Sequence, residues 1–491
     1  MPRIQTSFAV EDQKRFADFS GDSNPMHMDA VAARRTQAGG CVVHGVHGFL
    51  WILEQLAIDG VPLAALHSAK VSFTRFIRLD TPVSAVIRSD HVPIRLDLVQ
   101  DGQPIADILL RFSHHANEPC ADDVPFRAER LPAVPLEPDF ASLRAARGVL
   151  APPAEAAALA GLLFPRCVAA LGAARVVSIG LLSSLVGMVA PGLRSIFSSL
   201  DLRFVSSDQP ARVRYAVAFL DDRFRALRLD VTGSGFAGSV GAFMRFPPVA
   251  PPDLAKVEAK IAPDEFAGCH ALVVGGSRGL GACAAKLFAA GGGSVAVTYR
   301  SGRSEAELVR HDIEARYGPG RCAILPYDTA GEPSRQLCAL PGEFSHVYYF
   351  ATGRIDAQIE PIFDRKRLET FVDFYVDGFD RLVRYMIARA SGKGLHVFYP
   401  SSVFVQDRPR GMVEYAMAKA AGEILCRELE RRHLNLKVSL PRLPRVLTDQ
   451  TATVPPVASA DPVEILAALL GRRGVAPGEA AAVAPAEFTA S

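Results

Sequence analysis

The sequence has few of the features that mark secreted, metal-binding or membrane-spanning chains. Its eight cysteines are scattered and no two have the C-x-x-C spacing, so neither a zinc site nor a disulfide framework is expected. The formal net charge of +2 gives no reason to expect binding to nucleic acid or to a membrane. The first residues lack a signal-peptide pattern, and glycine and proline interrupt the longest apolar run, near 175–193. We therefore expect no membrane span, no metal site and a cytoplasmic location.

What the sequence does contain is enough apolar residues for large cores. With 491 residues, of which 49% are hydrophobic and 22% charged, the chain should form about two to four globular domains. A proline cluster predicts a linker over 247–262, and an end rich in alanine and proline predicts a disordered tail over 471–491. The chain is thus divided into a block that ends near 246 and a block over 263–470.

The first block contains an internal repeat. An apolar helix over 43–60 precedes Pro62, and a second apolar helix over 174–189 precedes Pro191, an offset of 129 residues (191 − 62). A run typical of a β-strand follows each proline.

The same offset relates the turns of the two copies. It places the hairpin turn Asp101-Gly102 of the first copy near Thr232-Gly233 in the second. A helix followed by an antiparallel meander, twice over, predicts an α+β double hotdog with copies at 1–118 and 130–246. The alternative is two unrelated α+β segments.

The second block alternates short apolar strands with helical stretches. This rhythm predicts an α/β fold with a doubly wound parallel sheet. The strands are expected at 270–274, 294–299, 323–325, 347–350, 395–399 and 436–440.

A glycine-rich loop follows the first of these strands. The segment from Gly275 to Gly281 reads G-G-S-R-G-L-G and leads into a helix over 282–290. The spacing G-x-x-x-G-x-G lets the backbone turn tightly and approach a pyrophosphate at a helix N-terminus. The sequence therefore predicts a dinucleotide site, with contacts from Gly275, Ser277, Arg278, Gly279, Leu280 and Gly281.

Two arginines bear on the choice of cofactor. Enzymes that use NAD usually place an acid at the end of the second strand, where it holds the ribose 2′-hydroxyl. This chain has Arg300 there and Arg278 in the glycine loop, and both suit a 2′-phosphate. The pattern favours NADP(H); the alternative is that Arg300 is only a solvated strand end.

A tyrosine and a lysine lie one helical turn apart farther along the chain. Tyr415 and Lys419 form a Y-x-x-x-K pattern, and Ser402 precedes Tyr415 by thirteen residues at the end of a strand. With the glycine loop, this set resembles the short-chain dehydrogenase/reductase family. The resemblance implies that Tyr415 protonates a carbonyl oxygen, that Ser402 orients this oxygen, and that Lys419 lowers the phenol pKa by its charge. Ser401 is an adjacent alternative to Ser402.

The same resemblance implies further cofactor contacts and reveals three departures. Asp328 matches the aspartate that contacts adenine, and Ala351 and Gly353 belong to the loop after the fourth strand. That loop reads Ala351-Thr352-Gly353 in place of the family's N-A-G, and Tyr375 replaces the asparagine of the fourth helix. Pro444-Arg445 stands in place of the usual P-G.

The segment from Ser20 to Asp29, S-G-D-S-N-P-M-H-M-D, holds Asp22 and His27 on a turn-prone loop. With Val43-His44-Gly45 and the strand at 71–76, it resembles the MaoC-like, R-specific enoyl-CoA hydratase family. The resemblance implies that His27 is the base toward water at Cβ, while Asp22 assists and protonates Cα. A backbone amide near Gly45 would stabilise the thioester enolate.

The alternative is that Asp22 only caps the loop and that His27 is inert. His47 has no counterpart in the family, and we interpret it as structural. The second copy of the repeat lacks the Asp/His pair, so we expect it to be a non-catalytic scaffold that completes the substrate tunnel.

Together the two resemblances imply a bifunctional enzyme. A reductase would convert a 3-oxoacyl thioester into the 3-hydroxyacyl form with NADPH, and a dehydratase would convert that form into the trans-2-enoyl thioester. The carrier would be CoA or acyl carrier protein, and the family relation implies a homodimer or a higher homo-oligomer. Two alternatives are a reductase whose first half only binds the thioester, and a non-catalytic scaffold.

Overall fold

The chain folds into two compact units. The computed structural model describes residues 4–89, 92–113, 128–340, 342–357, 362–453 and 457–471. The first unit comprises Met1–Pro248 with Ala452–Val457, and the second comprises Val249–Thr451 with Ala458–Ser491. Cys120 and nearly all of the predicted tail, from 472 on, lie outside the described residues.

Two of the predicted boundaries are wrong. The predicted linker contains the helix α8 (Leu254–Glu258), and Val257 on this helix is fully buried in a core of the second unit. Residues 452–457 were assigned to the reductase block but cluster with the first unit. The chain therefore passes between the units at Pro248, because the residues that follow already pack.

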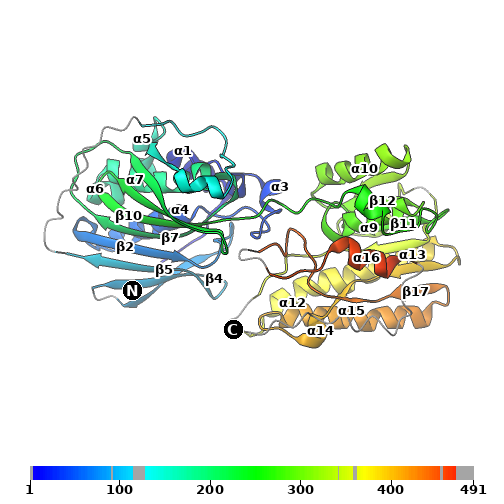
Figure 1. The fold of residues 1–491 in the computed structure, drawn as a ribbon. Helices are drawn as coiled ribbons and strands as arrows, with labels where there is room; N and C mark the ends of the chain where they lie inside the picture. Colours follow the sequence, from blue (N-terminus) through cyan, green and yellow to red (C-terminus); the bar gives the residue numbers. More distant parts are fainter. Residues whose placement is uncertain are drawn as a thin grey trace, which may run out of the picture. The chain divides into compact units, whose positions relative to one another are not determined.

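The first unit is built on a ten-stranded antiparallel sheet (Figure 1). Its order is β1-β3-β4-β5-β2-β7-β10-β9-β8-β6. The strands are β1 (Gln5–Thr6), β2 (Leu66–Phe73), β3 (Val83–Ser89), β4 (Ile94–Gln100), β5 (Gln103–Phe112), β6 (Arg147–Leu150), β7 (Ser195–Phe204), β8 (Val213–Asp221), β9 (Ala226–Gly233) and β10 (Phe236–Met244).

The strand order repeats outward from the centre of this sheet. On one side it runs β2-β5-β4-β3-β1, and on the other β7-β10-β9-β8-β6, with β2 and β7 paired at the centre. The two halves are therefore two copies of one arrangement. The predicted turn at Thr232-Gly233 is wrong, because Gly233 ends β9 and the turn falls at Ser234-Gly235. The offset between the first residues of matching strands grows from 129 for β2 and β7 (195 − 66) to 133 for β5 and β10 (236 − 103).

Helices cover one face of this sheet (Figure 1). The central ones, α4 (Gly45–Ile58) and α7 (Ala173–Ser184), are apolar on most sides, and such helices are stable only when buried. The predicted helix over 174–189 continues from α7 as the π-helix η3 (Leu185–Val189). The other helical segments are α1 (Val10–Ser20), α2 (Pro25–Met28), α3 (Ala30–Ala33), α5 (Ala156–Leu163), α6 (Pro165–Leu171), η1 (Leu63–Ala65), η2 (Ala141–Ala145) and η4 (Gly192–Arg194).

Among the described residues, no single helix is long and apolar enough to cross a membrane. The pair Pro165–Leu171 and Ala173–Val189 reaches the length and composition only together, and it is bent by 117°.

The second unit is built on a six-stranded parallel sheet, which confirms the predicted doubly wound fold. Its order is β13-β12-β11-β14-β15-β17, so the direction of winding reverses between β11 and β14. Ligands bind at such a switch point, outside the carboxyl ends of the strands. The strands are β11 (His270–Val274), β12 (Ser294–Tyr299), β13 (Cys322–Pro326), β14 (His346–Tyr349), β15 (Leu395–Phe398) and β17 (Leu436–Ser439), with a separate pair β16 (Ser401–Ser402) and β18 (Arg442–Leu443).

Two separate cores lie on the two faces of this sheet. One is formed with α9 (Gly279–Ala290), α10 (Arg303–Tyr317) and α16 (Pro462–Leu470). The other is formed with α12 (Arg365–Val372), the π-helix η5 (Asp373–Asp377), α13 (Gly378–Arg389) and α15 (Val413–Arg432). The short helices α11 (Pro333–Gln336) and α14 (Phe404–Asp407) lie in loops.

Candidate active sites

The loop between α1 and α2 presents the predicted Asp/His pair. Gly21 ends α1 in the left-handed region at φ 78°, where a residue with a side chain would be strained. Asn24 then caps α2, its side-chain oxygen accepting from Met26 N at 3.0 Å. Asp22 lies between these two stops, and His27 lies on the single turn of α2.

Asp22 is almost completely buried, and the second copy of the repeat supplies part of its surroundings. Its Oδ2 accepts a hydrogen bond from Ser183 Oγ at 2.6 Å, and its Oδ1 accepts from Asn24 N at 3.2 Å. A methyl group on Gly187 would collide with the carboxylate, so only glycine leaves room there. Burial raises the pKa of Asp22 above its ordinary value, against the opposing effects of His27 and Ser183. The carboxyl is therefore easier to protonate than an exposed one.

His27 is held in one tautomer when it is neutral. Its Nδ1 lies 2.8 Å from the carbonyl oxygen of Val42, which can only accept, so Nδ1 carries the proton and Nε2 keeps a lone pair. Burial lowers the pKa of His27, although the nearby Asp22 opposes this effect. A neutral imidazole with a free lone pair can act as a base.

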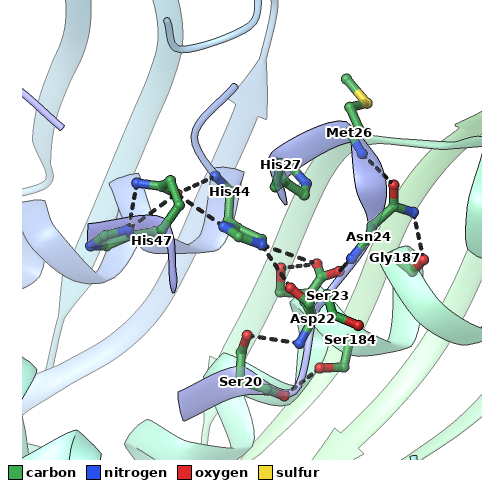
Figure 2. A network of polar contacts seen from close by, with 12 residues as sticks. Ser20, Asp22, Ser23, Asn24, Met26, His27, His44, His47, Ser184 and Gly187 are labelled. Carbon is green, nitrogen blue, oxygen red and sulfur yellow. Dashed lines mark hydrogen bonds and ion pairs between the residues drawn. The ribbon is translucent and has the colours of Figure 1, made fainter. Parts of the chain in front are cut away.

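His44 lies beside this pair and contacts both of its members (Figure 2). Its ring stacks on His27 with centroids 3.8 Å apart, and its Nε2 lies 3.0 Å from the main-chain oxygen of Asp22. Its Nδ1 lies 3.0 Å from Gln13 Oε1, and the backbone N of His44 donates to the same oxygen at 3.1 Å. Burial lowers the pKa of His44 well below its usual range. His44, which in the sequence matched only a family pattern, therefore directly contacts the segment that carries Asp22 and His27.

Asp22, His27 and His44 also have the composition of a metal site. Their candidate ligand atoms all lie within 4.8 Å of one another. However, His44 Nε2 lies 3.0 Å from the main-chain oxygen of Asp22, and a ring nitrogen that faces a carbonyl oxygen donates a hydrogen rather than a lone pair. The three groups thus fit an acid–base network better than a metal centre.

His47 lies one turn farther along α4 and contacts Phe16 rather than the Asp22 carboxyl. Its ring stacks on Phe16 with centroids 4.6 Å apart, and its Nδ1 lies 3.3 Å from Gln13 Nε2. Burial lowers the pKa of His47 to about 3. These contacts are those of a packed, neutral side chain.

A pocket opens onto the pair. Asp22 and His27 line it together with the start of α4 and with apolar residues of both copies. The ring of Phe73 lies against Gly45, where a Cβ would be 3.2 Å from the ring. The lining also includes Arg75, Ser183 and Phe197. The pocket therefore presents an acid, a base and a hydroxyl among lining residues that are mainly apolar.

In the second unit the glycine loop lies at the carboxyl end of β11. Gly275 and Gly279 have positive φ angles of 73° and 57°. A Cβ on Gly281 would collide with the Gly275 oxygen, and one on Gly275 would lie 3.0 Å from Ala351 N. The loop can make its tight turn next to the end of β14 only because these positions lack side chains. Ser277 and Leu280 belong to the same turn, which leads into α9.

The predicted cofactor contacts lie on neighbouring strand ends. Arg300 is exposed directly after β12, and Asp328 follows β13 with its Oδ1 accepting from Ala330 N at 3.0 Å. Arg278 lies 3.7 Å from Asp449 Oδ2, an ion pair that the sequence did not indicate. Gly353 follows β14, where a Cβ would lie 3.0 Å from the ring of Phe374.

Ser402 and Tyr415 face each other at the switch-point end of the sheet. Burial raises the pKa of Tyr415, and the neighbouring Ser402 hydroxyl opposes this effect. Ser401, the adjacent alternative, instead donates to Glu423 at 2.5 Å. The structure thus brings Ser402, and not Ser401, to the tyrosine.

Lys419 does not act on Tyr415 in the predicted way. Its amine donates to the carbonyl oxygen of Pro400 at 2.7 Å and lies over the ring of Tyr375, 3.9 Å from the centroid. Burial lowers the pKa of Lys419 to about 7. The predicted lowering of the Tyr415 pKa by the Lys419 charge is wrong for this structure, because burial dominates and the opposing effect comes from Ser402.

The sequence did not identify the residues of the second copy that complete the first site. Ser183 and Gly187 lie more than 160 residues from Asp22, and no local pattern connects them to it. The spacing from Pro191, matched to Pro62, was the one signal that placed them near the end of a central helix.

Comparisons with known proteins concern parts of the chain. A family model described as the MaoC like domain matches residues 2–92, which confirms the resemblance over that stretch. Uncharacterized oxidoreductases from Mycobacterium tuberculosis and Mycobacterium bovis are each 27% identical over 243 residues, covering 45% of this chain and 71% of the relative.

Solved structures that are similar include short-chain dehydrogenases. One from Burkholderia cenocepacia, in complex with NADP, is 23% identical, covers 43% of this chain and 93% of its own, and has a TM-score of 0.37. L-sorbose reductase from Gluconobacter frateurii, complexed with NADPH and L-sorbose, is 16% identical, with coverages of 43% and 92% and a TM-score of 0.38. Each of these likenesses covers less than half of the chain.

Proposed function

We propose that the chain is a bifunctional enzyme of acyl-thioester metabolism. Its second unit reduces a 3-oxoacyl thioester to the 3-hydroxyacyl form with NADPH, and its first unit removes water to give the trans-2-enoyl thioester. The observation that supports this most is the presence of two separate proton-transfer sets, Asp22 with His27 and Ser402 with Tyr415. The first set lies in a double hotdog, as the matched repeats suggest.

The first set suits addition and removal of water. In hydration, the free Nε2 of His27 takes a proton from water as the oxygen attacks Cβ, and protonated Asp22 delivers a proton to Cα. The raised pKa of Asp22 and the lowered pKa of His27 both favour this neutral starting pair. Dehydration is the reverse: the Asp22 carboxylate takes the Cα proton and protonated His27 delivers one to the leaving hydroxyl.

The thioester oxygen needs stabilisation while negative charge develops on it. Gly45 lies at the start of α4 and lines the pocket, so its amide lies at the positive end of a helix dipole. An N–H donor at such a position stabilises an enolate oxygen, an effect worth about 3 kcal/mol in comparable oxyanion sites. Apolar walls such as Phe73 would exclude water and strengthen this interaction.

The second set suits carbonyl reduction. Tyr415 donates its phenolic proton to the substrate oxygen, and Ser402 orients this oxygen by a hydrogen bond. Lys419 lies one turn from Tyr415 and can keep a positive charge nearby at neutral pH, since its pKa is lowered only to about 7. The hydride itself is supplied by the nicotinamide when the cofactor is bound.

The glycine loop fits such a cofactor. Gly275 and Gly281 leave no space for side chains, and the turn leads directly into the N-terminus of α9, which favours a pyrophosphate. Arg300, exposed after β12, would meet a 2′-phosphate, so we assign NADP(H). Arg278 could take part only by leaving Asp449. The acyl carrier, CoA or acyl carrier protein, and assembly as a homodimer or higher homo-oligomer are parts of the same proposal.

The proposal is tested by following both steps in one protein. The wild-type chain, given a 3-oxoacyl-CoA and NADPH, should oxidise NADPH and form enoyl product; absence of both would contradict the proposal. His27→Ala should reduce dehydration by about a thousandfold, as for loss of a catalytic base, while NADPH oxidation persists. Tyr415→Phe should lose NADPH oxidation with the 3-oxoacyl thioester. It should still dehydrate a 3-hydroxyacyl thioester that is supplied directly.

The same variants separate the alternatives. If His27→Ala leaves dehydration unchanged, or if the wild type reduces the substrate without any dehydration, the first unit would only bind the thioester. If the wild-type chain binds no NADPH in a titration, a scaffold would be favoured.

A further inference from the structure

Lys419 is seated between two tyrosine rings in the second unit. Its amine lies 3.9 Å from the ring centroid of Tyr375 and 4.8 Å from that of Tyr399. Its only polar contact among the described residues is the hydrogen bond to Pro400 O. Tyr375 occupies the position where the family resemblance leads us to expect an asparagine.

Neighbouring residues are fitted to these two rings. The Tyr399 hydroxyl donates to the main-chain oxygen of Tyr375 at 3.1 Å. Gly422, three residues after Lys419 on α15, lies against them: a methyl group there would collide with the Tyr399 hydroxyl. The Tyr375 hydroxyl is hydrogen-bonded to Thr352, in the loop after β14. The hydroxyl contacts and the packing of Gly422 therefore hold both rings in place.

A cation over an aromatic ring is stabilised by the negative electrostatic potential of the ring face, most strongly where water is excluded. Lys419, Tyr375 and Tyr399 are all buried, so without these rings the ammonium would lose part of its compensation for desolvation. The Tyr375 ring also contacts the Tyr415 ring in an edge-to-face arrangement, with centroids 5.7 Å apart and planes at 81°. One side chain thus contacts both the lysine and the tyrosine.

We propose that Tyr375 is a positioning residue whose ring, with that of Tyr399, seats the Lys419 ammonium beside Tyr415. The bond from its hydroxyl to Thr352 keeps the ring in place. The role of the seat in reduction rests on the proposed function, whereas its effect on the charge of Lys419 does not.

Two substitutions at one position test the seat. Tyr375→Phe keeps the ring, and Tyr375→Leu removes it while staying apolar. In the cofactor-free chain with carbon-13-labelled lysine, the titration midpoint of Lys419 should fall by about one pH unit in the leucine variant, as loss of a buried cation–π contact requires. It should be unchanged in the phenylalanine variant. The Lys419 signal is identified by its loss in Lys419→Met.

The kinetic readout should follow the same pattern. With NADPH and a 3-oxoacyl-CoA at pH 7, Tyr375→Leu should lower kcat by about tenfold, and Tyr375→Phe by no more than about threefold. Equal losses in both variants, or a leucine variant with an unchanged Lys419 midpoint, would overturn the proposal. If Tyr375→Leu does not fold, Tyr399→Leu against Tyr399→Phe repeats the test on the other ring. A wild type that oxidises no NADPH refutes the reductase, while the titration still decides the seat.

Discussion

The two copies of the repeat in the first unit share a strand order but use their central helices differently. Glu54 in α4 and Ser183 in α7 are separated by the same offset of 129 residues (183 − 54) as Pro62 and Pro191. Both are buried polar side chains that reach the opposite copy. Ser183 donates to Asp22, whereas Glu54 accepts from the backbone N of Arg166 and of Cys167 at 2.9 and 2.8 Å.

This difference shows how one arrangement serves two purposes. At the start of α6, Glu54 satisfies two N–H groups that have no partner within the helix, which is a structural task. At the start of α2, Ser183 and Gly187 approach a loop that carries an acid and a base. The second copy, predicted to be a non-catalytic scaffold, thus helps to shape the site. The following predictions test whether the two positions are really so different.

The largest effect is expected at Gly187 in the second copy. A methyl group there would displace the Asp22 carboxylate, so Gly187→Ala should reduce dehydration by about a hundredfold, as misplacement of a catalytic group does. Gly161→Ala is the matched control, because its Cβ on α5 points into open space. NADPH oxidation should be unchanged in both. A Gly187→Ala variant as active as the control would show that the second copy does not constrain Asp22.

The next effect concerns Glu54, and it should appear in stability rather than in rate. Glu54→Ala leaves two buried N–H groups without their acceptor, which should lower the free energy of unfolding by about 2 kcal/mol. The fluorescence of Trp51, the one tryptophan in the chain, reports on unfolding of this unit. Dehydration in the folded protein should change less than about twofold, since no catalytic group is touched. A large loss of dehydration rate in Glu54→Ala would contradict the view that Glu54 has a structural role and Ser183 a catalytic one.

Ser183→Ala should show the reverse pattern. Loss of the hydrogen bond to Asp22 should lower the dehydration rate by about tenfold, while stability changes by less than about 1 kcal/mol. Ser184→Ala is the control: its hydroxyl donates to the carbonyl of Ser20 rather than to the carboxylate. Steady-state dehydration and urea unfolding of the two variants measure the contrast. Equal rates would mean that the contact with Asp22 has no catalytic effect.

The smallest effect separates the copies by pH. The first copy holds the half-buried His27 and the buried His44 and His47, and the second holds no histidine. A histidine with a lowered pKa binds fewer protons when folded than when unfolded, so stability falls as the pH drops below about 6.5, by up to about 1.4 kcal/mol per pH unit for each histidine. His47→Phe should reduce the slope by about one such contribution between pH 6 and 5, measured from Trp51 fluorescence. An unchanged slope would mean that His47 is not buried in its neutral form.

Local sequence patterns were enough to identify the chemical groups. Asp22 lies in the loop just before α2, which carries His27, and Tyr415 and Lys419 lie one turn apart on α15, so local backbone geometry brings each pair together. The glycine loop was equally readable, because its turn depends on missing side chains within seven residues. The parallel sheet followed from the spacing of its strands, and the repeat from matched helices and prolines.

Tertiary structure decided which partners these groups meet. The contact of Ser183 with Asp22 spans 161 residues, and it depends on how α7 packs against the loop. Likewise, the Lys419 amine meets the ring faces of Tyr375 and Tyr399 and the carbonyl oxygen of Pro400, contacts that the sequence pattern did not indicate. Short-range patterns fix which residues lie on one turn, since bonded geometry is the same everywhere. The contacts that set the charge and pKa of those residues come from segments distant in the sequence, and these segments come close only when the whole unit packs.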